Sequence, residues 1–342
     1  MEDSSLTEET TAEETIVEKT VLEETTVKET MLEETMLEET IIENALTEDS
    51  LAEEEALIEE AIREPGISVF WRRLRKNKLA VAGLVVIIIL IIIAIFAPSL
   101  APAHYAEQDL TMIFAPSSRE HLLGTDFLGR DMLSRLIYGT RLSLEIGIFS
   151  TLIGLVLGTI LGTFAGFYSG RTDMVLMRFL DIYQSIPGLI LSIALATSLG
   201  PGLENAIIAL GVGTMPIYAR IIRASLLKVR SMEYIEAARA INANDFRIIM
   251  KHAMPNAFAP LLVQITMSIG LSILSASMLS FIGLGAQPPS AEWGAMLTAG
   301  KDYIRTNGNM IMYPGIAMVI TVLAFNLLGD GLQDALDPRL KN

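Results

Sequence analysis

Six apolar stretches of about membrane-spanning length follow one another after residue 78 of the chain. The first, 79–96, is almost wholly apolar and ends just before Pro98. As a helix it would extend about 27 Å, which is close to the thickness of the hydrocarbon layer. The other five stretches cover 144–167, 175–199, 206–222, 260–284 and 311–328. Because 51% of the residues are hydrophobic, the pattern predicts an all-α integral membrane protein with six transmembrane helices.

The later stretches contain more Gly, Ser and Thr than the first. Small residues allow helices to approach closely in lipid, so we expect a packed bundle with the first helix at its periphery. Pro187 and Gly188 fall inside the third stretch. Because proline removes a backbone donor and bends a helix, we expect a kink there, in a helix that lines a pathway.

Charge is distributed unevenly along the chain. The net charge is −15, but residues 1–60 hold 22 acidic residues and two Lys, whereas the other 282 hold 18 acidic and 23 basic residues. The membrane part is therefore mildly basic. The absence of Cys excludes disulfides and thiolate metal sites, and the three His residues are expected to be structural. The acidic start also lacks the basic and apolar regions of a signal peptide.

Residues 8–55 repeat every five positions, with Glu-Glu-Thr triplets separated by apolar pairs. Five residues advance a helix by about 500°, so the apolar pairs do not line up on one face, and a period of five does not fit a strand. Dense like charge favours an extended chain, and we predict a disordered tail over 1–62. The alternatives are a pentapeptide solenoid, in which stacked Glu would repel, and a regulatory tail that binds a partner.

Lys and Arg predict the orientation in the membrane. One basic group precedes the first span and consists of Arg72, Arg73, Arg75, Lys76 and Lys78. A second lies between the fourth and fifth spans and consists of Arg220, Arg223, Lys228, Arg230, Arg239, Arg247 and Lys251. Because positive loops stay inside, both termini are expected in the cytoplasm.

Some charges fit this orientation less directly. The external segment 101–143 carries four Arg residues, and we expect Asp126 and Asp131 to pair with them. Near the inner face, Arg178 and Asp181 are three residues apart, a spacing that predicts an ion pair on one face of a helix.

The segment 224–258 is the polar connection between the fourth and fifth spans. Strong helix formers occupy 236–241 and 246–254, with Asn242 and Asn244 between them. Asn tolerates a left-handed backbone better than other non-glycine residues, so a helix–turn–helix is expected.

Two further features of this connection bear on its role. Ala237, Ala238 and Ile241 would form a small apolar face suited to a groove on another protein. Pro255 would end the second helix and start the return into the bilayer. On the residues alone, a docking loop and a plain connector are equally favoured.

This connection resembles the coupling loop of membrane subunits of bacterial ABC importers. The pattern in that family is Glu-Ala-Ala, three residues, Gly, nine residues, Ile, one residue, Leu-Pro. The residues that match it are Glu236, Ala237, Ala238 and Pro255. Those that depart from it are Asn242 for Gly, His252 for Ile and Met254 for Leu. The resemblance implies that Glu236, Ala237, Ala238, Asn242 and Pro255 couple the chain to an ATPase.

Three other stretches, 121–144, 279–297 and 323–339, resemble the second (C-type) permease of dipeptide, oligopeptide and nickel importers. The resemblance covers about 65–340 and not the acidic tail. It implies a six-helix permease bundle. The expected order is an entry segment and first helix (63–100), an external segment (101–143), a core (144–332) containing the coupling loop, and a cytoplasmic C-terminus (333–342).

The resemblance implies a multi-pass permease subunit in a bacterial or archaeal cell membrane, serving an ATP-driven importer of dipeptides or oligopeptides. Nickel or a nickel chelate is the alternative substrate on the same scaffold. The implied partners are a homologous second permease, two ATP-binding ABC subunits that hold ATP-Mg, an extracytoplasmic substrate-binding protein and the lipid bilayer. No cofactor on this chain and no nucleic-acid partner are expected.

Motifs of other functional classes are missing. The nearest approach to a phosphate-binding loop, from Gly294 to Lys301, is one residue too long, and Asp302 stands where Ser or Thr is required. An ion-coupled secondary transporter needs titratable residues at mid-membrane, which the spans hardly offer. Zinc and nucleophile-elbow motifs are also missing, so we predict a non-catalytic chain.

Aromatic and acidic residues mark the ends of the last two spans. Trp293 and Tyr303 are of the types that suit a membrane–water interface, so Trp293 is expected either to anchor the chain there or to contact a substrate-delivering partner. Asp330, Asp334 and Asp337 recur at about one-turn spacing and predict a solvated face at the cytoplasmic end of the last span.

Overall fold

Residues 66–336 are described by a computed structural model of the chain. Regular structure in this range is helical, apart from one isolated bridge between Thr125 and Asp131. The chain divides into two compact units, Met1–Val69 and Phe70–Asn342. The helices below belong to the second unit, except for the first residues of α2 (Gly66–Lys76). The predicted acidic tail lies outside the described residues.

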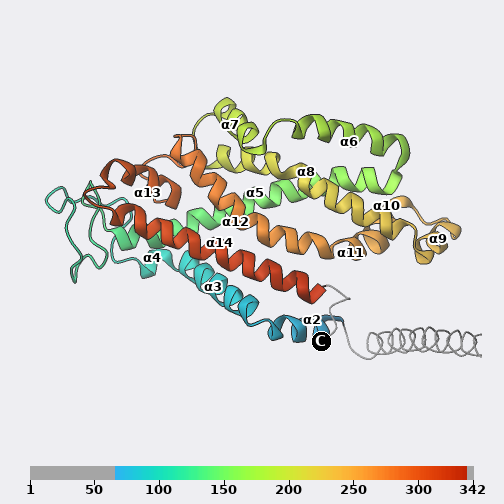
Figure 1. Ribbon diagram of the computed structural model, residues 1–342, viewed down its shortest axis with the longest axis horizontal. Helices are drawn as coiled ribbons and strands as arrows, with labels where there is room; N and C mark the ends of the chain where they lie inside the picture. Colours follow the sequence, from blue (N-terminus) through green and yellow to red (C-terminus); the bar gives the residue numbers. More distant parts are fainter. Residues whose placement is uncertain (1–65, 337–342) are drawn as a thin grey trace, which may run out of the picture. The chain divides into compact units, whose positions relative to one another are not determined.

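Within the described range, five helices are long and apolar enough to cross a membrane: α3 (Lys78–Ile95), α5 (Met132–Tyr168), α8 (Leu203–Arg230), α12 (Ala259–Phe281) and α14 (Asn309–Leu336). A sixth crossing results if α6 (Gly170–Gln184) and α7 (Gly188–Leu199) together count as one broken span. The long helices lie alongside one another (Figure 1). The predicted all-α membrane fold is confirmed. α5, α8 and α14 extend beyond the predicted apolar stretches at one or both ends.

α3 is the most exposed of the long helices. The side chain of Asn77 caps its first turn by accepting the N–H of Ala80 at 3.1 Å. Only 17% of α3 is buried, against 50% of the most apolar part of α8. Its large side chains are therefore exposed at the surface of the bundle, and the expected peripheral position of the first helix is confirmed. The short helix α4 (Ala97–Leu100) follows, with Pro98 in its first turn.

α5 and α8 form the most extensive helix pair of the described range. The α5 face toward α8 carries a glycine at every fourth position, namely Gly154, Gly158, Gly162 and Gly166. A Cβ atom at Gly158 would lie 2.4 Å from the carbonyl oxygen of Met215, and one at Gly162 would lie 2.3 Å from that of Ala219. The two backbones are therefore closer than any side chain would allow.

A buried apolar cluster of eleven residues lies where α3, α5, α12 and α14 meet α13 (Trp293–Gly300). Its members are Ile87, Met132, Leu144, Ile273, Trp293, Met296, Met310, Met318, Ala324, Phe325 and Leu328. Through Trp293 and Met296, this cluster joins α13 to α5, α12 and α14.

The third predicted span is broken at the residues expected to kink it. The axes of α6 and α7 differ by 83°, and Pro187 and Gly188 stand at the break. Asp181 of α6 pairs with Arg220 of α8 at 2.9 Å. The expected ion pair between Asp181 and Arg178 is therefore wrong. Asp173 receives hydrogen bonds from two nitrogens of Arg223. α6 is thus held to α8 by ion pairs between helices.

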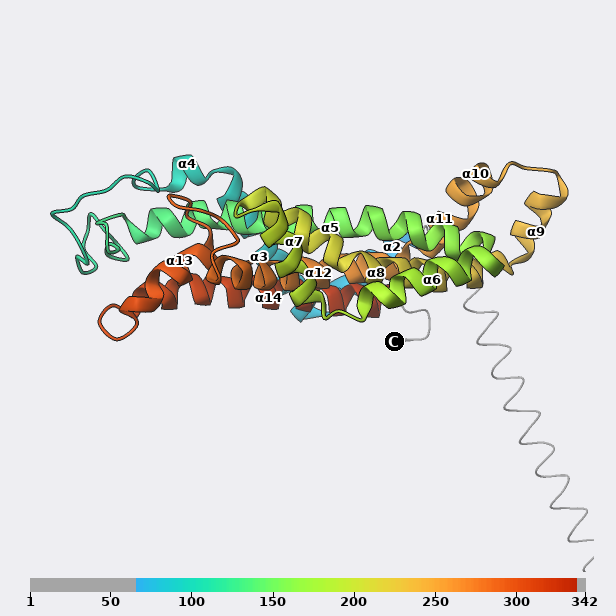
Figure 2. The same ribbon diagram turned by 90° about the horizontal axis from the view of Figure 1, so that it is seen from above.

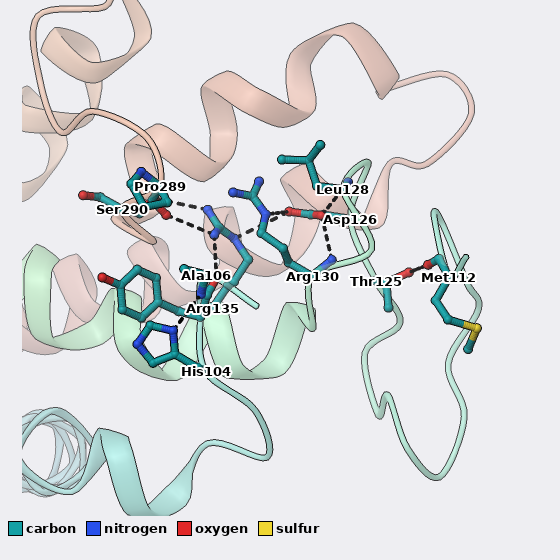
Figure 3. Close-up of polar contacts among 11 residues, drawn as sticks. His104, Ala106, Met112, Thr125, Asp126, Leu128, Arg130, Arg135, Pro289 and Ser290 are labelled. Carbon is teal, nitrogen blue, oxygen red and sulfur yellow. Dashed lines mark hydrogen bonds and ion pairs between the residues drawn. The ribbon is translucent and has the colours of Figure 1, made fainter. Parts of the chain in front are cut away.

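The segment 101–143, which was expected to be external, folds around a buried arginine cluster (Figure 3). Asp126 accepts a hydrogen bond from Nε of Arg130 at 2.6 Å and lies 3.7 Å from Nε of Arg135. Arg135 also donates to the carbonyl oxygens of Tyr105, Pro289 and Ser290. The expected pairing of Asp126 with arginines is confirmed, and Arg135 joins segments more than 150 residues apart.

Asp131 does not pair with an arginine as expected. One of its oxygens accepts the N–H of Ser134 at 2.7 Å, which caps the start of α5, and the other lies 3.0 Å from Nδ1 of His121. A carboxylate at a helix N-terminus satisfies free backbone donors there. The sequence position before a long helix explains this role better than the nearby charges do.

Trp293 is completely buried, so its expected place at a membrane surface or partner interface is wrong. Its Nε1–H donates to the carbonyl oxygen of Leu136 at 3.1 Å. The preceding Glu292 is also buried and accepts hydrogen bonds from Ser280 and from the N–H groups of Gly294 and Ala295. Burial raises the pKa of Glu292 above its ordinary value, against the hydrogen bonds that lower it. Together these residues lock α13 to α5 and α12.

Gly162→Ala is expected to destabilise the bundle by about 1–3 kcal/mol, because the added methyl group must separate α5 from α8. The measurement is thermal unfolding of the purified chain in detergent. Gly188→Ala is the matched control, since a Cβ atom there meets nothing within 4 Å. Equal midpoints for the two variants would contradict close packing along this face.

Candidate functional site: the helical loop between α8 and α12

The connection between α8 and α12 consists of four short helical segments. They are α9 (Glu233–Ala240), α10 (Asp245–Ile248), the π-helical turn η1 (Ile249–Ala253) and α11 (Met254–Ala257). α9 projects beyond the ends of α5 and α8 (Figure 2). The expected helix–turn–helix is present, although the first helix starts three residues before Glu236 and the second is irregular.

Asn242 makes the turn between α9 and α10. Its backbone is left-handed, with φ of 57°. The N–H of Asn242 donates to the carbonyl oxygen of Arg239 at 2.9 Å, and the N–H of Ala243 donates to that of Ala238 at 3.1 Å. This pair of bonds is the Schellman arrangement that ends a helix at a left-handed residue. The conformation expected of Asn242, where the resembling family has Gly, is therefore present.

One side of the loop is packed onto the spanning helices. Ile235, Ala238 and Ile248 are buried in a cluster with residues of α8, α11 and α12. The guanidinium of Arg239 lies 5.5 Å from the centre of the Phe167 ring, at the end of α5. The loop is therefore a rigid extension of these helices.

The other side of the loop exposes large apolar side chains. Ile241 is 80% exposed, Phe246 71% and Met250 54%. Glu236 and Ala237 are exposed as well. We call Glu236, Ala237, Ile241, Phe246 and Met250 the outer face of the loop.

The apolar face expected from the sequence is only partly correct. Ala237 and Ile241 are exposed, but Ala238 points inward. Phe246 and Met250 were missed by the sequence analysis. Their four-residue spacing within a polar connection is the signal that could have found them, because residues four apart share one face of a helix.

Pro255 does not end the second helix, in contrast to the expectation. The helical path passes from η1 through α11, which contains Pro255 in its first turn, and continues into α12. The N–H of Met254 donates to the carbonyl oxygen of Ile249, five residues earlier. A π-type turn inserts an extra residue just before the proline, which has no N–H to give. Pro255 itself is exposed.

A second feature is a hollow of about 260 Å³ beside the break between α6 and α7. It is lined by Gly188, Leu189 and Ser192 of α7, by residues 210–217 of α8 and by residues 264–275 of α12. The side chain of Gln264 donates to Oγ of Ser268 at 3.0 Å. The lining carries hydroxyl and amide groups and no charged side chain. Of the predicted pathway residues, Gly188 lies here.

The sequence matches two family models. Residues 158–342 match the model described as binding-protein-dependent transport system inner membrane component. Residues 67–116 match the N-terminal TM domain of oligopeptide transport permease C. The first match covers more than half of the chain. The chain belongs to this family of transport components.

Relatives of this transport component are permease proteins. The dipeptide transport system permease protein DppC of Alkalihalophilus pseudofirmus is 43% identical over 272 residues, which are 80% of this chain and 90% of the relative. The di/tripeptide transport system permease protein DppC of Pseudomonas aeruginosa is 43% identical over 282 residues, or 81% and 93%. The glutathione transport system permease protein GsiD of Shigella flexneri is 45% identical over 274 residues, or 80% and 90%.

A solved structure shares the fold of this transport component. A chain from the inward facing MetNI methionine ABC transporter matches with a TM-score of 0.50 and 24% identity. The match covers 60% of this chain and 98% of the other. At this identity, the likeness concerns the fold alone. It agrees with the helical membrane architecture described above.

Asn242→Val is expected to destabilise the α9–α10 turn by about 1–2 kcal/mol, because a β-branched residue resists the left-handed backbone. The measurement is hydrogen exchange of the loop in the purified chain, where faster exchange of the Asn242 and Ala243 amides is expected. Asn242→Gly is the control and should leave exchange unchanged or slower. Unchanged amide exchange in the Asn242→Val variant would argue against the observed turn.

Proposed function

We propose that the chain is the permease subunit of an ATP-driven, binding-protein-dependent importer of short peptides, coupled to its ATPase through the outer face of the loop. The observation that carries the proposal is the exposure of Phe246 and Met250 on a loop that is rigidly packed on its other side. Large apolar side chains exposed outside the spans are a feature of protein–protein contact sites.

The buried side of the loop supports a mechanical role. Ile235 and Ile248 pack with Ile222 and Leu226 of α8 and with Leu261 of α12. A partner that pushes on Phe246 therefore moves the ends of α8 and α12 together, since a close-packed cluster transmits displacement. The same two helices line the hollow beside the break between α6 and α7. ATP-driven motion at the loop would thus change the hollow, which is the requirement for alternating access.

The chemistry of the hollow favours peptides over nickel. Hydroxyl and amide groups such as those of Ser192, Thr214 and Gln264 can exchange hydrogen bonds with a peptide backbone. Nickel binds best to imidazole and other nitrogen ligands, and no His, Asp or Glu lines the hollow. The names of the relatives, which include dipeptide and glutathione permeases, support the same substrate class.

Transport by this arrangement requires several partners. A homologous second permease would complete the pathway, two ABC subunits would bind and hydrolyse ATP-Mg beneath the loop, and an extracytoplasmic binding protein would deliver the peptide. Both α2 and the loop lie at one end of the helices, opposite α4 and α13 (Figure 1). Because the basic residues concentrate at that end, the arrangement favours a cytoplasmic loop and cytoplasmic termini.

Phe246→Ala is expected to reduce peptide uptake and copurification of the ATPase by at least about tenfold, because truncation of an anchor residue costs roughly 2 kcal/mol of binding. Glu236→Lys is expected to uncouple ATP hydrolysis from uptake while the complex still inserts. Val319→Ala is the matched control, since Val319 is 66% exposed on α14. Normal uptake and copurification in the first two variants would remove the docking role.

Deletion of residues 2–60 is expected to leave peptide uptake largely intact. The acidic repeat lies outside the matched families, which start at residue 67. The measurement is uptake per inserted complex, with membrane insertion quantified in parallel. A deletion variant that inserts and assembles normally but fails to transport would assign the tail an essential role.

A further inference from the structure

A basic surface at the end of α2 is not used by the proposed transport mechanism. Five cationic residues stand within seven positions, namely Arg72, Arg73, Arg75, Lys76 and Lys78. No acidic residue occurs between Glu64 and Glu107 in the sequence. The basic surface is directly followed by the apolar helix α3. Its position along the chain is therefore where a helix enters the membrane.

The inner side of α2 is fixed to the bundle. Leu74 is only 3% exposed and packs in a small cluster with Ala80, Ala335 and Phe70. The side chain of Asn77 donates to a carboxylate oxygen of Asp334 at 3.1 Å. These contacts hold the junction of α2 and α3 against the end of α14. The side of α2 opposite Leu74 therefore faces away from the bundle.

The opposite side of α2 combines cations with one aromatic ring. Trp71 is 45% exposed and touches Phe70 edge-on, and Arg72, Arg75 and Lys76 are exposed. On a helix, residues 71, 72, 75 and 76 lie on one face, opposite Leu74. Lys78 and Leu79 are also exposed at the start of α3. We call Trp71, Arg72, Arg75, Lys76 and Lys78 the α2 face.

We propose that the α2 face binds the headgroups of anionic phospholipids. α3 enters the hydrocarbon layer at Leu79, so the α2 face lies at headgroup depth. Guanidinium and ammonium groups donate charge-assisted hydrogen bonds to phosphate, and an indole ring occupies the interface between chains and headgroups. A cluster of four or more cations next to a span attracts anionic lipid. The acidic groups on the neighbouring element are Asp330, which is exposed, and Asp334, which is engaged by Asn77.

Trp71 provides the probe for a direct test. The chain has two Trp residues, and Trp293 is completely buried. The full chain is reconstituted into vesicles of phosphatidylcholine with a minor fraction of phosphatidylglycerol, with bromine on the acyl chains of one lipid or the other. Quenching of Trp71 fluorescence then reports which lipid surrounds it, and Trp71→Phe gives the contribution of Trp293.

Brominated phosphatidylglycerol is expected to quench Trp71 far beyond its share of the lipid. The triple variant Arg72→Gln, Arg75→Gln, Lys78→Gln is expected to reduce that enrichment at least about tenfold, and high salt should weaken it. The matched control removes three exposed cations at the other end of the bundle through Arg119→Gln, Lys301→Gln, Arg305→Gln. It should retain the enrichment.

Three results would overturn the proposal. Quenching in proportion to bulk composition would show that the α2 face selects no lipid. Enrichment that persists in the triple variant would place the lipid contact elsewhere. Enrichment that appears only after deletion of residues 2–60 would assign the α2 face to the acidic tail of the same chain instead of the membrane. None of these results bears on peptide uptake, so failure here is distinct from failure of the transport proposal.

Discussion

The close approach of α5 and α8 is the contact on which the rest of the bundle depends. Within lipid there is no hydrophobic gain from bringing apolar helices together, so association relies on close van der Waals contact and hydrogen bonds. The glycine face of α5 supplies that contact by removing every Cβ atom that would separate the backbones. The partly exposed α6 is held to this pair by ion pairs to α8 and by the packing of Leu180 against Met215 and Ala219.

This rigid pair also determines where movement can occur. α8 is continuous from the hollow to the loop, and its end next to the loop, from Tyr218 to Val229, is buried against α5 and the loop cluster. By contrast, Gly188 stands at a sharp break and has open space around its Cβ position. A displacement of the loop would therefore be carried by α8 as a body and absorbed near the break, where the hollow lies.

The sequence predicts the spans well because a membrane-spanning helix requires a long stretch of apolar residues. Each predicted stretch corresponds to one helix except 175–199, which is divided between α6 and α7, and the first helix is peripheral as its uniform apolar character indicates. The lengths are less predictable. The first turns of α5 contain Arg135, a charged residue that the sequence places outside the apolar stretch. It is nevertheless buried, because it donates hydrogen bonds to Tyr105, Pro289 and Ser290. Contacts with residues distant in sequence decide such positions.

In the candidate site, too, some features could be predicted from the sequence and others could not. The left-handed turn at Asn242 follows from a local backbone preference and was predictable. The inward direction of Ala238 and the burial of Trp293 depend on which helix packs beside them. The local sequence does not predict those neighbours. Trp293 is buried because the carbonyl oxygen of Leu136 satisfies its N–H, which removes the usual reason for an indole to stay at the interface.

The arginines of the external segment illustrate why charge counts need structural context. Four arginines in the segment 101–143 weaken a prediction of orientation that is based on counting alone. Arg130 and Arg135 are buried against Asp126, and Arg141 lies 3.1 Å from Glu145. A cation neutralised within the fold adds little to the field that a membrane experiences. Basic residues also stand at the end of α2, next to the start of the first span, and Arg72, Arg75 and Lys76 among them are exposed. The paired arginines of the segment 101–143 therefore count little against the orientation that the other basic residues favour.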